Sequence, residues 1–174
     1  IKIEDALIKI LSSPNHSNKS WVTNQYDQMV MCNTVQKSGS DAAIVRIHNK
    51  DKAIAVSVDS SANYCKSHPL TGGKQIVCEN WRNLISVGAK PLAITNCLNF
   101  GNPENQEIMG EFAECLEGIK ESCNFLNYPV VSGNVSFYNG TNKKNIYPTP
   151  VIGGVGLIKT LSTPMSHKFK KENS

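Results

Sequence analysis

The sequence contains no long apolar run, and no stretch approaches the roughly 20 residues that a membrane-spanning helix needs. It has little excess of either charge, with 18 Lys and Arg against 14 Asp and Glu in 174 residues, and only 7% of its residues are aromatic. A nucleic-acid-binding surface combines a basic face with aromatic side chains on which bases stack. We therefore expect neither a membrane protein nor a nucleic-acid-binding protein. The 40% of hydrophobic residues suffices for one soluble domain with a buried core.

The sequence also lacks a recognisable start and a zinc or redox motif. It begins without an initiator Met or the apolar core of a signal peptide, and we interpret it as a segment of a longer protein. Its six cysteines include no Cys-x2-Cys pair, and only four His are present to complete a zinc site. We therefore expect reduced, mostly buried thiols in a cytoplasmic protein.

Hydrophobic periodicity predicts the secondary structure. Apolar residues recur at steps of three or four in three segments, which we predict to be helices: 4–12, 74–87 and 106–126. Runs rich in β-branched residues predict the main strands: 42–47, 52–58, 91–95 and 149–158. The segment 19–40 has no regular pattern, and 129–131 is a further short strand.

This order of elements indicates an α/β fold, with a mixed four-stranded sheet and helices on one of its faces. No third helix of comparable quality is available to cover the other face. We divide the chain into an N-terminal helix with an irregular leader (1–36), a domain of sheet and helices (37–165) and a polar tail (166–174).

Two loops expected after strands are the best candidates for a ligand site. Open α/β sheets bind ligands where strands end, and 96–103 and 132–136 are polar segments in such places. In the second segment, Gly133 permits close backbone approach, Asn134 offers an oxygen to a hard cation and Ser136 offers a hydroxyl. From spacing alone, an ordinary Asn/Ser turn remains the stronger interpretation of 132–136.

Three other patterns carry less weight. The segment 71–75 resembles the end of a phosphate-binding P-loop, but Gln75 stands where Ser or Thr must bind magnesium, so a helix-entry turn is favoured. The glycines at 154 and 156 lie inside a predicted strand, where a structural role is favoured. A nucleophilic pair of Cys65 and His68 lacks a third group to orient it.

Taken together, several blocks of the sequence resemble one family. They are Trp81-Arg82-Asn83-Leu84, Pro91-Leu92-Ala93-Ile94-Thr95, 97–103, 131–136 with Tyr138-Asn139, and 147–153. In this order they closely resemble phosphoribosylformylglycinamidine synthase, synthetase subunit, within the superfamily of aminoimidazole ribonucleotide synthetase. The blocks at 98–103 and 132–136 are the most specific, and the first of them disfavours a related selenophosphate synthetase.

The resemblance implies a fold and a reaction. Family members contain two copies of a paired-domain unit, and this segment is similar to the N-terminal-type domain of the second copy, half of a barrel that a partner domain completes. The family uses ATP, Mg²⁺ and glutamine-derived ammonia to convert formylglycinamide ribonucleotide to the amidine, a carbon–nitrogen ligation in purine biosynthesis. Its catalytic His belongs to the first copy, so the resemblance implies no catalytic residue here and an isolated segment that is inactive.

The resemblance also implies individual contacts. Asn96 and Gly133 correspond to ATP contacts, Asn134 to a magnesium ligand and Ser136 to a contact with the ribonucleotide substrate. Relatives often have Asp where this chain has Asn96, so an acidic role is not expected there. The stretch beginning at Asp59 lacks the Pro and Arg that the family usually has.

Expected partners follow from the same resemblance. They are the first-copy domain, a glutaminase subunit and a small accessory subunit, with no nucleic acid and no membrane. For the segment alone, the uncovered sheet face predicts a two-fold homodimer. The alternative from a different class is a structural half-barrel module with a degenerate nucleotide site and no catalytic role.

Overall fold

A computed structural model describes residues 2–26, 30–37, 39–142, 144–162 and 165. Its helices are α1 (Ile3–Leu11), α2 (Ser20–Tyr26), α3 (Ala62–Ser67), α4 (Pro69–Ser86) and α5 (Gln106–Leu126), with a 3-10 turn at Pro14–His16. Its strands are β1 (Thr34–Gln36), β2 (Ala43–Arg46), β3 (Ala53–Asp59), β4 (Lys90–Asn99), β5 (Val130–Ser136), β6 (Gly140–Thr141), β7 (Lys144–Asn145) and β8 (Thr149–Ile158). The polar tail expected at 166–174 lies outside the described residues.

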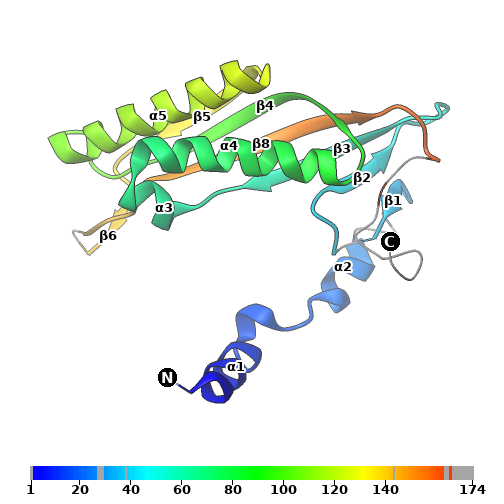
Figure 1. The fold of residues 1–174 in the computed structure, drawn as a ribbon, viewed down its shortest axis with the longest axis horizontal. Helices are drawn as coiled ribbons and strands as arrows, with labels where there is room; N and C mark the ends of the chain where they lie inside the picture. The colour runs from blue at the N-terminus through cyan, green and yellow to red at the C-terminus, as the bar shows by residue number, and fades with distance from the viewer. Residues whose placement is uncertain (1, 27–29, 38, 143, 163–164, 166–174) are drawn as a thin grey trace.

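The main sheet has six strands in the order β1-β2-β3-β8-β4-β5, and α4 and α5 lie side by side on one of its faces (Figure 1). The fold class is confirmed, and the four predicted strands form the middle of the sheet. The expected four-stranded sheet was too small, because β1 and β5 extend it at its two edges. The short strand predicted at 129–131 is the beginning of β5. All pairs are antiparallel except β4 and β5, which are parallel and joined through α5.

The edge strand β5 corrects the prediction of a loop at 132–136. Ser, Gly and Asn favour turns, but every residue from 130 to 135 is exposed on a strand that pairs with β4 alone. A strand paired on one side only can present polar residues to water, so pairing overrides the local turn preference. Likewise, β4 continues to Asn99, beyond the expected end at residue 95. The segment 19–40 was also predicted as irregular, yet it contains α2 and β1.

Helix α4 begins at Pro69, five residues before the expected start, and this changes the role of its glycines. The N–H of Gly72 donates to the carbonyl of His68 at 2.7 Å, so it is a helical bond rather than a free donor for an anion. A Cβ atom on Gly73 would lie 2.4 Å from the carbonyl oxygen of Cys115, and one on Gly118 would lie 2.0 Å from that of Leu70. These glycines therefore allow α4 and α5 to pack closely, and 71–74 is neither a P-loop nor a helix-entry turn.

A polar network is buried between α4 and the sheet. Asn80 is fully buried, and its Nδ2 donates to Asp59 Oδ2 at 2.7 Å and to the Ser57 carbonyl at 3.0 Å. Its Oδ1 accepts a hydrogen bond from the Tyr128 hydroxyl at 2.8 Å. A Cβ on Gly154 would lie 1.9 Å from Asn80 Oδ1, so this glycine makes room for the network, as its predicted structural role requires.

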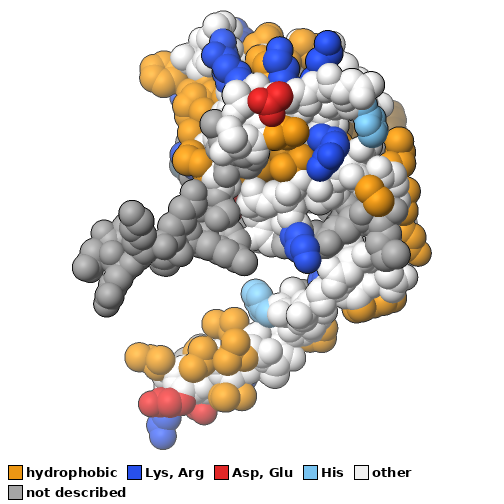
Figure 2. Space-filling view, turned by 90° about the vertical axis from the view of Figure 1, so that its right-hand side faces the viewer, with side chains coloured by type: hydrophobic (Ala, Val, Ile, Leu, Met, Phe, Trp, Pro, Cys, Tyr) orange, Lys and Arg blue, Asp and Glu red, His pale blue; other side chains and the backbone are white. Residues whose placement is uncertain are grey.

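The opposite face of the sheet, which we call the open face, carries exposed apolar side chains. In β3 the residues alternate: Ala53, Ala55 and Ser57 are buried, whereas Ile54, Val56 and Val58 are exposed. Val155 of β8 pairs with Val56 and is also exposed. Helix α1 has no buried residue, and in Figure 2 the N-terminal segment projects away from the body. The structure thus confirms that helices, α4 and α5, cover one face of the sheet.

Candidate functional site

The four residues expected to contact ligands lie on the adjacent parallel strands β4 and β5. Asn96 is opposite Gly133, Cys97 is opposite Asn134 and Asn99 is opposite Ser136. Each residue lies on a strand, not in the loop predicted from its sequence, because the parallel pairing continues to Asn99 and Ser136. The pairing nevertheless brings all four predicted residues to one edge of the sheet.

The same four residues are divided between the two faces of that edge. Asn96 alternates with the buried residues Ile94 and Leu98, so it belongs to the face covered by the helices. A Cβ on Gly133 would lie 2.2 Å from Asn96 Oδ1, so the side chain of Asn96 lies over the backbone of Gly133. Asn134 and Ser136 belong to the open face, which also follows from the period of two along β5. A ligand that contacts all four must therefore reach around the exposed edge strand.

A hollow of about 350 Å³ on the open face surrounds Asn134. Its lining residues are Val58, Thr95, Asn96, Cys97, Ser132, Gly133, Asn134, Val151 and Gly153. The Ser132 hydroxyl donates to Thr95 Oγ1 at 2.7 Å, and Asn134 Nδ2 lies 3.9 Å from Cys97 Sγ. A second hollow of about 480 Å³ lies between α5 and β5 and includes Asn96 and Gly133. The edge of the sheet is thus hollowed on both sides, with polar groups in each hollow.

Sequence reasoning did not single out Thr95, Cys97 and Ser132 as members of this site. The alternation of side chains along a strand could have found them, because Thr95 and Cys97 share a face, as do Ser132 and Asn134. Because 96–103 and 132–136 were interpreted as loops, the alternation of side chains was not applied to them.

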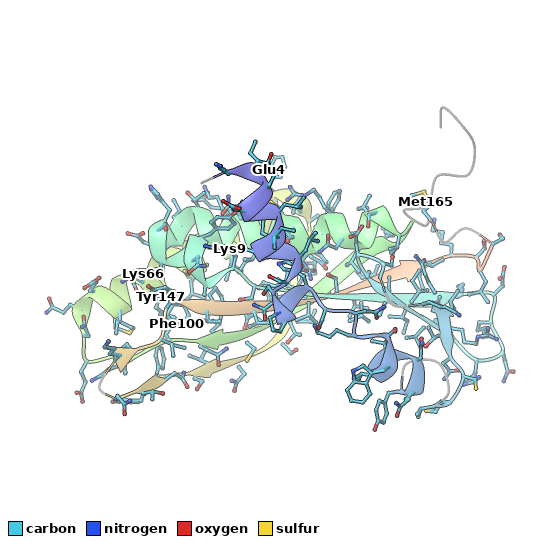
Figure 3. The ribbon with its side chains drawn as sticks, turned by 90° about the horizontal axis from the view of Figure 1, so that it is seen from below. Glu4, Lys9, Lys66, Phe100, Tyr147 and Met165 are labelled. Carbon is cyan, nitrogen blue, oxygen red and sulfur yellow. The ribbon has the colours of Figure 1, made fainter. Side chains whose placement is uncertain are left out.

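Ser136 is held at the end of β5 by a residue that sequence reasoning noted only as part of a motif. The Asn139 side chain donates from Nδ2 to the Ser136 carbonyl at 2.9 Å and to the Phe100 carbonyl at 3.0 Å. The same nitrogen lies 3.1 Å from Ser136 Oγ. Phe100 and Tyr147 lie at this end of the sheet in Figure 3, with Met165 at the other end.

The donor set fits a magnesium ion only as a partial site. Asn134 is exposed, and its amide oxygen is a ligand type that hard cations accept. Among the residues that the structure describes, no three His, Cys, Asp or Glu side chains converge to hold a metal. Mg²⁺ is commonly bound through one or two protein oxygens, with phosphates and water completing the octahedron. One amide oxygen beside a nucleotide is compatible with that mode.

Other groups that could carry chemistry have structural partners. Asp59 accepts hydrogen bonds from Ser57, Asn80 and Asn83, so its carboxylate belongs to the buried network. Cys65 is buried against Cys115 while His68 is exposed, which does not support a nucleophilic pair. The hydrogen bond to Cys65, together with burial, raises the pKa of the Cys115 thiol and keeps it neutral.

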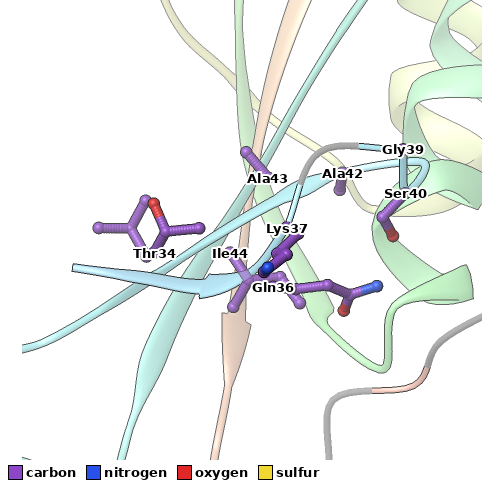
Figure 4. A pocket seen from close by; sticks show the side chains of 9 residues that line it. Thr34, Gln36, Lys37, Gly39, Ser40, Ala42, Ala43 and Ile44 are labelled. Carbon is purple, nitrogen blue, oxygen red and sulfur yellow. The ribbon is translucent and has the colours of Figure 1, made fainter. Parts of the chain in front are cut away.

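The cysteines and the remaining large hollow lie apart from this chemistry. Cys65, Cys78, Cys97, Cys115 and Cys123 are free thiols. Cys65, Cys115 and Cys123 are buried, whereas Cys32 and Cys97 are exposed, so burial is less general than expected. A hollow of about 410 Å³ between β1 and β2 is lined by Thr34, Lys37 and Ile44 among others (Figure 4). None of the four predicted site residues lines it.

Within the described ranges, no helix is long and apolar enough to cross a membrane.

The chain is similar to known proteins in both sequence and structure. A phosphoribosylformylglycinamidine synthase subunit PurL from Pelagibacter ubique is 60% identical over the whole chain, which spans 24% of that relative's length. The structure is similar to Thermotoga maritima PurL complexed with ATP, with 35% identity and a TM-score of 0.73 over 84% of this chain and 24% of that one. It is similar to the same protein complexed with FGAR, with 36% identity and a TM-score of 0.72 over the same shares.

The chain thus spans about a quarter of the length of the proteins it matches. The N-terminal domain of AIR synthase related proteins matches residues 39–158, from the loop before β2 to the end of β8. Because this match includes more than half of the chain, the chain belongs to the family of AIR synthase related proteins, as an N-terminal domain of that family.

Proposed function

We propose that the chain is the ATP-, magnesium- and substrate-contacting domain of a phosphoribosylformylglycinamidine synthase, an ATP-dependent carbon–nitrogen ligase of purine biosynthesis. The observation that carries the proposal is the parallel register of β4 and β5. It aligns Asn96 with Gly133 and places Asn134 and Ser136 next along the same edge. The relative that is 60% identical and the PurL structures complexed with ATP and with FGAR support this function over a purely structural half-barrel.

In this function the residues of the edge have separate tasks. The bare backbone of Gly133 admits the nucleotide, and the Asn96 amide that lies over it supplies a neutral polar contact. Asn134 offers its amide oxygen to Mg²⁺, which when bound offsets charge that develops on the transferred phosphoryl group. Ser136 offers its hydroxyl to the ribonucleotide. The chain holds and orients its ligands, and the catalytic acid–base group comes from another domain.

The proposal includes the surroundings of the domain. The open face, with Val58 at 67% exposure, is the surface that a partner domain covers to complete a barrel. The glutaminase and small accessory subunits supply ammonia and complete a cytoplasmic assembly. The isolated chain binds its ligands weakly and has no synthase activity, because positioning by the other domain is missing.

The experiment uses the Pelagibacter ubique subunit with its matching segment replaced by residues 1–174 of this chain. In this chimaera, Asn134→Ala should raise the Mg²⁺ concentration needed for half-maximal activity about tenfold, since a ligand of the ion is lost. Asn124→Ala removes an exposed amide from α5, away from the open face, and is the matched control. If Asn134→Ala leaves the Mg²⁺ requirement and the turnover unchanged, the domain is a structural half-barrel instead.

A further inference from the structure

The side chain of Asn139 joins the ends of β4 and β5. Its Nδ2 donates to the carbonyl of Phe100, which follows β4, and to the carbonyl of Ser136, which ends β5. These two acceptors fix the orientation of the amide, because a flipped amide would point its oxygen at both carbonyl oxygens. The amide NH2 group of Asn139 therefore faces the two strand ends.

The backbone of Asn139 is held on both sides as well. Its N–H donates to the Phe100 carbonyl at 3.2 Å, and its own carbonyl accepts from the N–H of Ile146 at 3.1 Å. Phe100, whose carbonyl accepts from Asn139, packs its ring edge-on against Phe112, with ring centroids 5.1 Å apart. Asn139 is thus a half-buried residue attached to a rigid base, and its side chain has little freedom to swing away.

This arrangement decides how the Ser136 hydroxyl can act. Asn139 Nδ2 also lies 3.1 Å from Ser136 Oγ, and because its two hydrogens already point at the carbonyls of Phe100 and Ser136, the hydroxyl accepts a shared, bifurcated hydrogen bond. The hydroxyl hydrogen has only the Asn139 Oδ1 at 3.3 Å as its partner, a long bond for an O–H donor. A ligand oxygen near Ser136 can readily replace that partner, and the hydroxyl then donates to it while still accepting from Asn139.

We propose that Asn139 is a positioning residue that holds the Ser136 hydroxyl as a hydrogen-bond donor toward an oxygen of the ribonucleotide substrate. The inference rests on the proposed function, in which Ser136 contacts that substrate. Asn139 does not touch the substrate itself, and it acts by orienting the serine hydroxyl.

A double-mutant cycle on steady-state kinetics of the chimaeric subunit tests this role. Ser136→Ala should raise KM for the ribonucleotide about tenfold and leave KM for ATP unchanged, since one hydrogen bond to a polar oxygen is lost. Asn139→Ala should raise the same KM by a similar factor. The double variant should be no worse than Ser136→Ala alone, because Asn139 acts through a hydroxyl that is then absent.

The matched control is Asn145→Ala, which acts on the hairpin of β6 and β7 without touching Ser136. Asn145 Oδ1 accepts from the N–H of Asn102 at 2.9 Å and packs over Gly101. This variant should lower the melting temperature and leave KM for the ribonucleotide unchanged. If Asn139→Ala yields no soluble protein, the cycle is run with Asn139→Leu, which keeps most of the side-chain volume and has no hydrogen-bond donor.

The outcomes separate the inference from the proposed function. An unchanged KM in Ser136→Ala overturns both, because the serine then does not contact the substrate. A raised KM in Ser136→Ala with an unchanged KM in the Asn139 variant overturns the positioning role alone. The positioning role is also overturned if the fold-changes in KM of the two single variants multiply in the double variant. It is likewise overturned if Asn145→Ala raises KM equally, since Asn139 would then act only by stabilising the local structure.

Discussion

The two faces of the central sheet differ although the same strands form them. Along β3, Ala53, Ala55 and Ser57 are packed under α4, whereas Ile54, Val56 and Val58 alternate with them and are exposed. On the helix face, the side chain of Asn80 forms hydrogen bonds with Ser57, Asp59 and Tyr128, so these buried polar groups have partners within the chain. The open face exposes apolar side chains to water, which is energetically unfavourable. The helix face is therefore covered within the chain, whereas the open face exposes an apolar surface of the kind that often binds a partner.

This comparison predicts that the largest losses of stability come from changes on the helix face. Gly118→Ala places a methyl group 2.0 Å from the Leu70 carbonyl oxygen, so α4 and α5 must move apart. We expect a loss of about 3 kcal/mol in the free energy of unfolding, measured by urea denaturation. Gly110→Ala on the same helix meets nothing within 4 Å and should stabilise by about 0.5 kcal/mol. Equal effects at both positions would contradict close packing of the helices.

The buried network gives the next largest expected effect. Asn80→Ala leaves the Tyr128 hydroxyl and the Asp59 carboxylate short of a partner. The free energy of unfolding should fall by about 2 kcal/mol, because unsatisfied buried polar groups cost that much. Tyr128→Phe, which removes only the hydroxyl, should cost less. If the phenylalanine variant is the more damaging of the two, the network is not centred on Asn80.

A smaller effect is expected at alkaline pH from a buried thiol. Burial, with a lesser contribution from Cys78, raises the pKa of Cys123 to about 11 from its ordinary value of 9.0. Between pH 9 and 11 the unfolded chain releases this proton while the folded chain keeps it, so stability falls as pH rises. The contribution lost is about 1 kcal/mol at pH 10. Cys123→Ala should therefore flatten the decline of Tm across this window.

The control for that experiment lies on the other face of the sheet. Cys97→Ala removes an exposed thiol of the open face. Its Tm should decline with pH in parallel with that of the unchanged chain. If the two cysteine variants flatten the curve equally, burial on the helix face is not the cause.

The sequence predicted the elements whose signal comes from burial. Helix α5 and the strands β2, β3 and β8 have apolar residues at the expected period, because one side of each segment packs in the core. The helix predicted at 4–12 is present as α1, but none of its residues is buried. The same signal predicted an uncovered sheet face. These features depend on patterns within one segment and can therefore be derived from local sequence.

The features that were missed depend on pairing with distant residues. The strand identity of 132–136 comes from pairing with β4, and the role of Gly73 inside α4 comes from its close contact with Cys115 of α5. The division of the site between two faces follows from the strand alternation and was hidden for the same reason. The roles of Asn96, Gly133, Asn134 and Ser136 came from the resemblance to a family, since Ser, Gly and Asn alone are typical of turns.

The smallest expected change in stability, and the sharpest test of the open face, is Val58→Lys. Val58 is 67% exposed, so the free energy of unfolding should change by no more than about 0.5 kcal/mol. In a two-fold homodimer, in which each sheet completes half of a barrel, the lysine would bring charge into an apolar interface and weaken association. Sedimentation at micromolar concentration should show the unchanged chain at twice 19.1 kDa and the variant at 19.1 kDa. Asn124→Lys adds the same charge on α5 and should leave the dimer intact. A monomeric unchanged chain would show that the open face does not pair with a second copy, and a dimer that survives Val58→Lys would place the interface elsewhere.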